Sequence, residues 1–313
     1  MRVAAIDCGT NSIRLLIADN DNGVLTDVHR EMRVVRLGQG VDATCRLMEE
    51  ALARTFAATE DYAELIKTHG AQRVRFVATS ATRDAQNRQV FIDGIRARLG
   101  VEPEVVSGDE EAALSFAGAA SVLPGLGLPL ALVVDLGGGS TEFVAGNTAG
   151  VQAGISTNMG CVRFTERYLL SDPPTAAEIT AAEAEIEDNI SAVLATVPLA
   201  EVDSLIGVAG SVTTITAQAL NLPGYDRGQI HGAVLPAAQI IRACTDLLGM
   251  TRAQRQALPF MHPGRVDVIG AGALIWRTVV ARLGVLTAGR VDSVTASEHD
   301  ILDGIALGIS RQD

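Results

Sequence analysis

Two similar stretches of this chain, residues 7–12 (Asp-Cys-Gly-Thr-Asn-Ser) and residues 135–142 (Asp-Leu-Gly-Gly-Gly-Ser-Thr-Glu), begin 128 positions apart. Each has a short apolar run before it and a further run of apolar or alternating residues after it. Apolar runs on both sides of a glycine-rich turn predict a β-hairpin, so the chain is expected to contain the same hairpin twice. A repeated hairpin favours two related α/β domains.

The composition of these two turns indicates phosphate binding. Glycines let the backbone turn sharply and bring its N–H groups close to an anion, and the hydroxyls add further donors. The leading residues, Asp7 and Asp135, are of the type that holds a divalent metal, which neutralises phosphate charge. Two such hairpins facing each other across a cleft would hold a phosphate chain from both sides.

The charge of the chain limits its partners. A formal net charge of −12 over 313 residues argues against DNA or RNA as a partner, because non-specific nucleic-acid binding needs a basic face. An acidic protein that binds polyanions must supply local cations, either arginines or bound metal. This requirement directs attention to arginines near the glycine turns.

Targeting and redox signals favour the cytoplasm. The N-terminus leads directly into a strand, without the pattern of a signal peptide. No apolar run is expected to reach the roughly 18–20 residues that span a bilayer, so no membrane contact is predicted. The four cysteines are scattered without a CxxC pair, which argues against a zinc site or a disulfide framework.

Helical and strand patterns predict an α/β order in both halves. In the first half we expect helices over residues 47–69, 89–99 and 109–120 and strands over 73–78 and 104–106. In the second half we expect helices over residues 175–196, 236–248 and 263–283, one after the strand 204–208, a strand near 291–294, and a last helix from about 298.

The Pro- and Gly-rich segment 124–129 reads as a linker. It divides the chain into an N-terminal domain, residues 1–124, and a C-terminal domain, residues 125–313. The last helix, about 298–313, is expected to pack back onto the first domain.

Ordered blocks of sequence along the chain resemble one known family. Residues 7–15 are similar to the pattern DxGSNSxRL, residues 78–87 to ATSAxRDAxN, and residues 107–112 to SGxEEA. Residues 135–142 match DxGGGSTE, residues 159–163 match MGxVR, and residues 209–214 and 265–273 also fit. Together they resemble the exopolyphosphatase/guanosine pentaphosphate phosphatase (Ppx/GppA) family of the actin-like ATPase superfold, in a short, two-domain form.

The resemblance implies two ribonuclease-H-like domains and a metal-dependent phosphohydrolase that releases terminal orthophosphate from inorganic polyphosphate, with Mg²⁺, or alternatively Mn²⁺, as cofactor. It places the catalytic base at Glu111, the second acid of its pair. Glu110 is then mostly structural. The resemblance also makes a homodimer plausible.

Site residues follow from the matched blocks and from the need for cations. The metal candidates are Asp7, Asp135 and Glu142. The phosphate-binding candidates are Asn11, Ser12, Arg14, Arg83, Gly137, Gly138, Gly139, Ser140 and Arg265. For Arg163, and equally for Arg265, a solvated surface position is an almost equal alternative, and the acids of the two hairpins could simply cap their turns.

Other functions remain open at this point. The same site would serve a guanosine pentaphosphate (pppGpp) 5′-phosphohydrolase, and one sequence does not separate the two substrates. An ATP-binding kinase or an actin-like assembly protein is a further interpretation, although the chain is short for it. A non-catalytic polyphosphate or (p)ppGpp sensor is another.

Overall fold

The computed structural model describes residues 1–120 and 130–309 and divides the chain into two compact units. Unit 1 consists of residues 1–118 together with the segment that begins at Ile301, and unit 2 consists of residues 119–300. The predicted linker 124–129 lies outside the described residues, so the boundary between residues 124 and 125 stays a prediction.

Unit 1 is built on a five-stranded sheet with the order β3-β2-β1-β4-β5. Its strands are β1 (Arg2–Cys8), β2 (Ser12–Asp21), β3 (Val24–Val34), β4 (Arg73–Ala78) and β5 (Glu104–Val105). The first three form an antiparallel meander, whereas β4 pairs with β1, and β5 with β4, in parallel. The first glycine turn therefore joins β1 to β2 beside the C-terminal end of β4.

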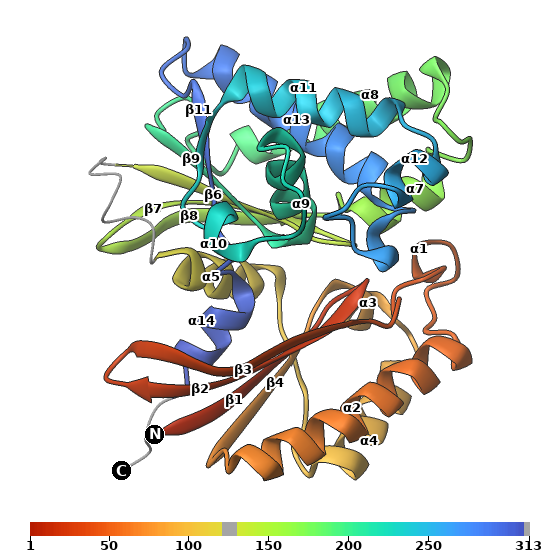
Figure 1. Cartoon of the computed structure of the whole chain (residues 1–313), viewed down its shortest axis with the longest axis vertical. Helices are drawn as coiled ribbons and strands as arrows, with labels where there is room; N and C mark the ends of the chain where they lie inside the picture. The colour runs from red at the N-terminus through yellow and green to blue at the C-terminus, as the bar shows by residue number, and fades with distance from the viewer. Residues whose placement is uncertain (121–129, 310–313) are drawn as a thin grey trace. The chain divides into compact units, whose positions relative to one another are not determined.

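Helices cover both faces of this sheet (Figure 1). They are α1 (Val41–Thr44), α2 (Glu49–His69), α3 (Ser80–Asp84), α4 (Arg88–Leu99), α5 (Gly108–Ala119) and α14 (Ile301–Leu307). Alternate residues of β1 pack into different clusters: Ala4 and Ile6 toward α2 and α4, and Val3 and Ala5 toward α14. Successive side chains of β1 point to opposite faces of the sheet, and both faces are covered by helices. Unit 1 therefore has three layers: helices, sheet and helices.

Unit 2 repeats the arrangement with one strand added. Its strands are β6 (Ala131–Leu136), β7 (Thr141–Asn147), β8 (Gly150–Thr157), β9 (Ser204–Val208), β10 (Val234–Pro236) and β11 (Ser293–Ala296). The sheet order β10-β11-β9-β6-β7-β8 is the order of unit 1 read in reverse, with β10 as an extra antiparallel edge strand. The second glycine turn joins β6 to β7 as the first joins β1 to β2.

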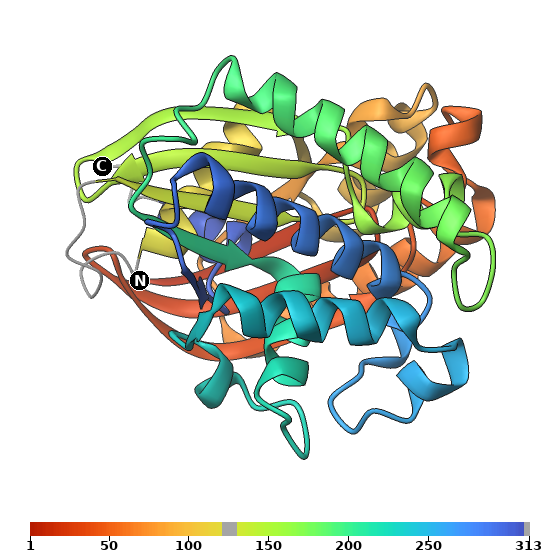
Figure 2. The same ribbon diagram turned by 90° about the horizontal axis from the view of Figure 1, so that it is seen from above.

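The helices of unit 2 are mostly packed over one face of its sheet (Figure 2). They are α7 (Cys161–Arg167), α8 (Ala176–Leu194), α9 (Ala209–Ala219), α10 (Arg227–Ile230), α11 (Ala237–Gly249), α12 (Arg252–Gln256) and α13 (Ile269–Leu286). The central helix α13 contacts α7, α8, α9 and α11, and this explains why it is apolar on nearly every side.

The apolar helix α13 corrects one sequence expectation. With 18 residues and a mean hydropathy of 1.5, it is the one helix among the described residues that is long and apolar enough to cross a membrane. However, 67% of this stretch is buried inside unit 2, as expected for a core helix, so it is weak evidence for a membrane span. The expectation that no apolar run reaches such a length was wrong.

The α/β class and the two ribonuclease-H-like sheets are confirmed, and most of the predicted elements occur within one or two residues of the expected bounds. The helix predicted over 263–283 was wrong at its start: Pro263–Arg265 is a short 3-10 turn and α13 begins at Ile269. The last helix begins at Ile301 rather than about 298, and the strand predicted near 291–294 spans Ser293–Ala296.

Candidate active site

The two glycine turns have the same backbone geometry. In unit 1 the N–H of Gly9 donates to the carbonyl of Ser12 at 3.0 Å, and in unit 2 the N–H of Gly137 donates to the carbonyl of Ser140, also at 3.0 Å. Each turn is closed by one hydrogen bond across four residues. The repeat recognised in the sequence is therefore also a repeat of main-chain conformation.

The carbonyl groups of the second turn are used by the segment that follows β8. The N–H groups of Cys161 and Val162 donate to the carbonyls of Gly137 and Gly138 at 3.0 and 2.8 Å. The Nε of Arg163 donates to the carbonyl of Gly139 at 2.9 Å. Because C=O and the next N–H point in opposite directions across a trans peptide, the N–H groups of residues 138–140 face away from this segment.

Gly160 allows this close packing. A Cβ at this position would lie 2.4 Å from the carbonyl oxygen of Gly138 and 2.6 Å from the carbonyl carbon of Gly139. Any side chain here would push the turn out of place. Residues 159–163 therefore hold the second glycine turn in place by packing against its carbonyl groups and donating hydrogen bonds to them. Arg163 takes part in this contact and is not a solvated surface residue.

The first turn is supported in the same way by residues 35–38, which the sequence analysis did not single out. The N–H groups of Val35 and Arg36 both donate to the carbonyl of Asn11, at 3.1 and 2.8 Å, and that of Gly38 donates to Thr10 at 2.8 Å. A Cβ on Gly38 would lie 2.2 Å from Cγ2 of Thr10. The N–H of Asn11 and that of Ser12 are oriented away from residues 35–38, as in the second turn.

The residues that face each other across the two hairpins differ in charge. In unit 1 Asp7 lies opposite Arg14, and Oδ2 of Asp7 accepts hydrogen bonds from Nε and Nη2 of Arg14 at 2.9 and 2.6 Å. In unit 2 the equivalent pair is Asp135 and Glu142. Directly opposed residues of an antiparallel pair point to the same side, so two carboxylates meet where unit 1 has an ion pair.

The carboxylates of Asp135 and Glu142 suit a hard divalent cation. Both side chains are buried, and Oε1 of Glu142 accepts a hydrogen bond from the hydroxyl of Ser156 at 2.7 Å. Neighbouring buried carboxylates repel each other unless a cation or a proton lies with them. Among residues 1–120 and 130–309 no group of three or more His, Cys, Asp or Glu side chains could hold a metal. Mg²⁺ needs no larger set, since one or two carboxylates with water and phosphate oxygens suffice.

Glu111 lies in the first turn of α5, buried in unit 1. Its Oε2 accepts a hydrogen bond from Nη1 of Arg83 at 2.9 Å, and the same nitrogen donates to the carbonyl of Val106. Burial raises the pKa of the Glu111 carboxyl to about 7, the charge of Asp7 acts in the same direction, and Arg83 and the hydroxyl of Thr79 oppose the rise. A carboxyl group with this pKa can accept a proton at neutral pH.

Glu110 has a different role. Its Oε2 accepts hydrogen bonds from the N–H and the hydroxyl of Ser107 at 2.9 and 3.0 Å, and its own N–H donates to the Ser107 hydroxyl at 3.2 Å. This reciprocal arrangement is a capping box, which fixes the start of α5. The geometry of the pair thus leaves Glu111 as the acid available for chemistry.

Several buried polar atoms lie in and beside the first turn. The hydroxyls of Thr10, Ser80 and Thr82 and Oδ1 of Asn11 have no hydrogen-bond partner among the residues that the structure describes. Thr10 and Asn11 belong to the turn, and the other two belong to the short helix α3 that carries Arg83. Buried polar groups of this kind call for a bound polar species such as phosphate or water.

Arg265 has a well-defined place in unit 2. Its guanidinium lies against Gly210, where a Cβ would be 2.3 Å from Nη2, and its Nη1 donates to the hydroxyl of Thr214 at 3.3 Å. Gly210 follows Ala209, a non-glycine residue with φ of 72° at the start of α9. Such a conformation is strained and is often found at functional sites. His262, which accepts a hydrogen bond from the N–H of Gly264, caps the turn before it.

The predicted site residues are thus distributed over the two units. Unit 1 holds Asp7, Asn11, Ser12, Arg14, Arg83 and Glu111. Unit 2 holds Asp135, Gly137, Gly138, Gly139, Ser140, Glu142 and Arg265. Within unit 1, Asp7 lies with Arg14 and Glu111 with Arg83. That the two sets act on one substrate stays a prediction.

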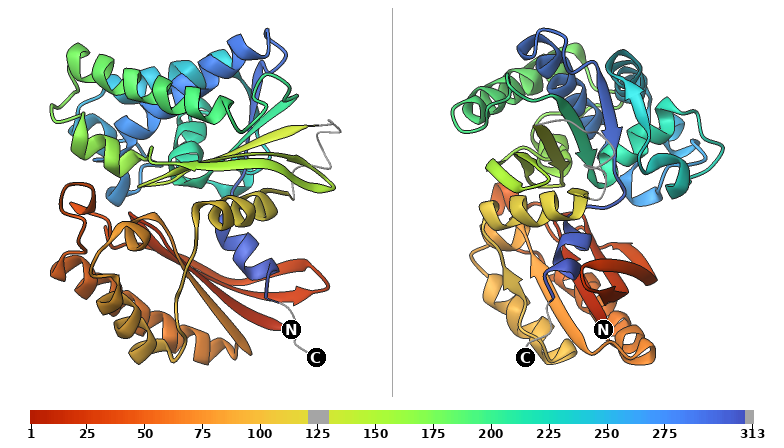
Figure 3. Two further views of the ribbon diagram at one scale, coloured as in Figure 1. Left: turned by 180° about the vertical axis from the view of Figure 1, so that it is seen from behind. Right: turned by 90° about the vertical axis from the view of Figure 1, so that its left-hand side faces the viewer.

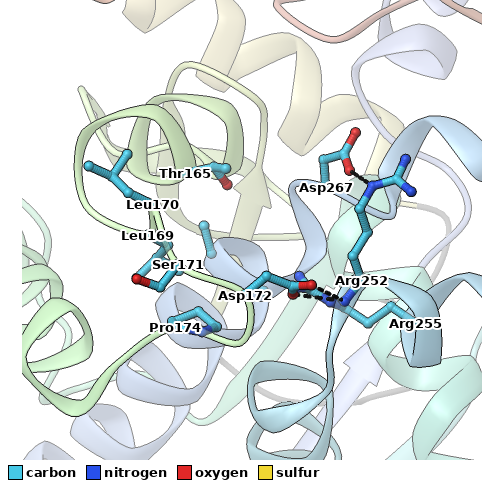
Figure 4. A pocket seen from close by; sticks show the side chains of 11 residues that line it. Thr165, Leu169, Leu170, Ser171, Asp172, Pro174, Arg252, Arg255 and Asp267 are labelled. Carbon is cyan, nitrogen blue, oxygen red and sulfur yellow. Dashed lines mark hydrogen bonds and ion pairs between the residues drawn. The ribbon is translucent and has the colours of Figure 1, made fainter.

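A separate pocket in unit 2 contains none of the predicted residues (Figure 4). Asp172 accepts hydrogen bonds from the N–H of Arg252 at 2.7 Å and from Nη2 of Arg255 at 2.9 Å, and Nε of Arg252 donates to Asp267 at 2.6 Å. These four charges compensate one another. The pocket is therefore a poor candidate for polyanion binding.

The chain is similar to known proteins over nearly its whole length. The chain matches the model of the Ppx/GppA phosphatase family over residues 16–308. It is 52% identical to "Exopolyphosphatase 2" of Mycobacterium tuberculosis over 318 residues, which cover 99% of this chain and 98% of that protein. It is 27% identical to the "Guanosine-5'-triphosphate,3'-diphosphate pyrophosphatase" of Aliivibrio fischeri, covering 98% of this chain and 59% of that protein.

A solved structure is also similar. The crystal structure of an exopolyphosphatase-like protein superimposes with a TM-score of 0.94 and 47% sequence identity, covering 98% of this chain and 96% of that one. Family match, identity and structural similarity all extend over nearly the whole chain. The chain belongs to the Ppx/GppA phosphatase family.

Proposed function

We propose that this protein is an exopolyphosphatase that hydrolyses the terminal phosphoanhydride bond of inorganic polyphosphate and releases orthophosphate, with a divalent metal as cofactor. The observation that carries the proposal is the setting of Glu111: a buried carboxyl group with a pKa near 7, hydrogen-bonded to Arg83 in the unit that holds the first glycine turn. The 52% identity to a protein named exopolyphosphatase supports the same choice of substrate.

The proposed reaction is attack of water on the terminal phosphorus atom. Glu111 accepts a proton from the water while the oxygen of that water forms the new P–O bond. At the same time the bond between the terminal phosphorus and the bridging oxygen breaks. The shortened polyphosphate leaves with that oxygen. Arg83 keeps the carboxyl group in place. The N–H groups of the two turns, with Arg14 and Arg265, bind phosphate oxygens and hold the chain in line.

Asp135 and Glu142 are the proposed metal ligands, and Mg²⁺ is the metal we expect, with Mn²⁺ as a substitute. When bound, such an ion neutralises negative charge on the phosphate oxygens. Asp7 stays a prediction as a third ligand, because Arg14 already provides a cation for its carboxylate. Asp135 and Asp7 are given different roles because their cross-strand partners differ: Asp135 lies opposite Glu142, and Asp7 lies opposite Arg14.

Two alternatives use the same residues. A pppGpp 5′-phosphohydrolase is supported by the similarity to the pyrophosphatase of Aliivibrio fischeri, which is more distant than the exopolyphosphatase. A sensor of polyphosphate or (p)ppGpp would bind without turnover, and the raised pKa of Glu111 favours an enzyme instead.

A comparison of substrates tests the proposal. Orthophosphate release is measured from long-chain polyphosphate and from pppGpp at equal phosphate-end concentration, with Mg²⁺, with Mn²⁺ and with EDTA. We expect a higher kcat/KM for polyphosphate and loss of activity in EDTA. Preference for pppGpp would select the first alternative, and binding of either compound without phosphate release from folded protein would select the sensor.

The pH dependence of kcat/KM provides an independent prediction. Glu111 must be ionised to accept a proton, and burial together with the charge of Asp7 raises its pKa from 4.5 to about 7. We therefore expect kcat/KM to rise about tenfold per pH unit below neutrality and to level off above it, measured from about pH 5.5 to 9 at saturating metal. A kcat/KM that stays constant between pH 5.5 and 7 would contradict a base with a pKa near 7.

We also propose a reducing compartment, the cytoplasm, as the place of action. Cys8, Cys45, Cys161 and Cys244 are all free thiols, and three of the four are buried. Unpaired thiols are typical of reducing compartments. The homodimer stays a prediction, as does the absence of a DNA, RNA or membrane partner.

A further inference from the structure

A glycine in α14 allows that helix to touch α5 through the main chain. A Cβ on Gly304 would lie 2.0 Å from the carbonyl oxygen of Leu114, 2.8 Å from its carbonyl carbon and 3.2 Å from its Cα. Glycine is unfavourable inside a helix, where it has no special backbone conformation to provide. Its presence at residue 304 is therefore explained by this contact. Figure 3 (right) shows α5 and α14 next to each other in unit 1.

The contact is one helical turn away from the proposed base. Leu114 follows Glu111 by three residues on α5, and residues at this spacing are neighbours on a helix surface. A displacement of the α5 main chain at Leu114 would move Glu111 relative to Arg83, which belongs to α3 and would not move with it. The hydrogen bond of 2.9 Å between Arg83 and Glu111 depends on the position of α5.

The other side of α14 is fixed to the sheet. Nη2 and Nη1 of Arg30, on β3, donate to the two carboxylate oxygens of Asp303 at 2.5 and 3.1 Å, and Asp303 is buried. Ile301, Leu302 and Ile305 are buried in the cluster that contains the strand residues of unit 1. Because α14 is anchored in this way, a side chain at residue 304 would displace α5 rather than α14.

We propose that Gly304 is a positioning residue for catalysis: by allowing α14 and α5 to pack main chain against main chain, it sets the place of Glu111 opposite Arg83 and Asp7. This inference rests on the proposed function, since it takes Glu111 as the base. Gly304 itself touches no substrate, and its effect is transmitted through α5.

The test compares Gly304→Ala with Gly308→Ala, a matched control in the same segment. The one short contact of a Cβ on Gly308 would be with Nη1 of Arg75 at 2.9 Å, the end of a flexible side chain, while the carbonyl oxygens of Gly304 and Ile305 would lie at ordinary van der Waals distances of 3.5 and 3.6 Å. Misplacement of a catalytic group by about 1 Å can cost about 10²-fold in rate. We expect Gly304→Ala to lower kcat by at least about tenfold with KM changed by less than about twofold, and Gly308→Ala to resemble the parent. Equal kcat in Gly304→Ala and parent would overturn the inference.

A double substitution separates positioning from general damage. In the Glu111→Gln background there is no base left to misplace, so adding Gly304→Ala should not lower the residual rate further. A further loss of the same size would mean that Gly304 acts on the fold and not through Glu111. If Glu111→Gln alone keeps full turnover, Glu111 is not the base and the proposed mechanism fails, independently of Gly304, whereas absence of phosphate release from the parent protein would refute the proposed function itself.

A milder change covers the case in which Gly304→Ala is not obtained folded. Arg30→Lys keeps the charge beside Asp303 but loses the two-nitrogen contact that anchors α14 to β3. We expect a smaller fall in kcat that also disappears in the Glu111→Gln background. A fall that persists there would count against the positioning role.

Discussion

Replacing Glu111 by glutamine is expected to lower kcat for orthophosphate release by about 10²–10⁴-fold, the usual contribution of a general base. Glutamine has nearly the same shape and can still accept the hydrogen bond from Arg83, so the loss comes from the missing negative charge and basicity. KM should change by less than about threefold, because substrate phosphates are bound by other groups. The measurement is steady-state kinetics with polyphosphate, with thermal unfolding as the check of the fold.

Glu110→Gln is the matched control for this experiment. The adjacent glutamate caps α5 through Ser107, and its side chain contacts none of the predicted site residues. We expect a small loss of stability and unchanged kcat. If both variants lost activity to the same extent, the distinction between the two acids would be wrong. If neither did, another group would have to activate the water.

Asp135→Asn is expected to weaken metal binding by at least about 10–100-fold, a loss that follows even from changes in the partners of metal ligands. Without metal, the variant should be at least as stable as the parent, because asparagine removes one of two neighbouring buried negative charges and with it their mutual repulsion. The parent should gain thermal stability on addition of Mn²⁺ or Mg²⁺, and the variant should lose most of this gain. Thermal unfolding with increasing metal, without substrate, measures both effects.

Asp7→Asn serves as the comparison because it lies at the equivalent position of the first hairpin. There the carboxylate is paired with Arg14, so its neutralisation should leave most of the metal-induced stabilisation intact. Loss of the metal effect in Asp7→Asn as well would make Asp7 a third ligand. An unchanged metal effect in Asp135→Asn would contradict the proposed metal site.

The repeated hairpin could be predicted from sequence because its signals are local. Apolar runs, glycines and hydroxyls within a dozen residues specify a strand, a turn and a second strand. The third strands, β3 and β8, were not predicted. Most residues of β3 are only partly buried, and polar side chains such as Asp27 and Arg30 interrupt the alternation. The start of α13 was misplaced because Pro263 begins a separate turn rather than the helix.

The features of the site that depend on register and distant packing could not be predicted. That Asp7 faces Arg14 while Asp135 faces Glu142 follows from how each hairpin pairs. The environment of Glu111 is assembled from β1, α3 and α5, and the support of α5 by Gly304 joins residues almost two hundred positions apart. Family resemblance singled out Glu111 as the candidate base, which stays a prediction, whereas its burial and the raised pKa of its carboxyl group could be seen only in the fold.

The position of α14 has a consequence for the order in which the chain can fold during synthesis. The core of unit 1 includes Ile301, Leu302 and Ile305, yet all of residues 119–300 are synthesised between α5 and these side chains. Domains usually fold in the order in which they leave the ribosome. Here the first unit must wait with one face of its sheet uncovered until the second has been made, and the proposed base reaches its final surroundings only then.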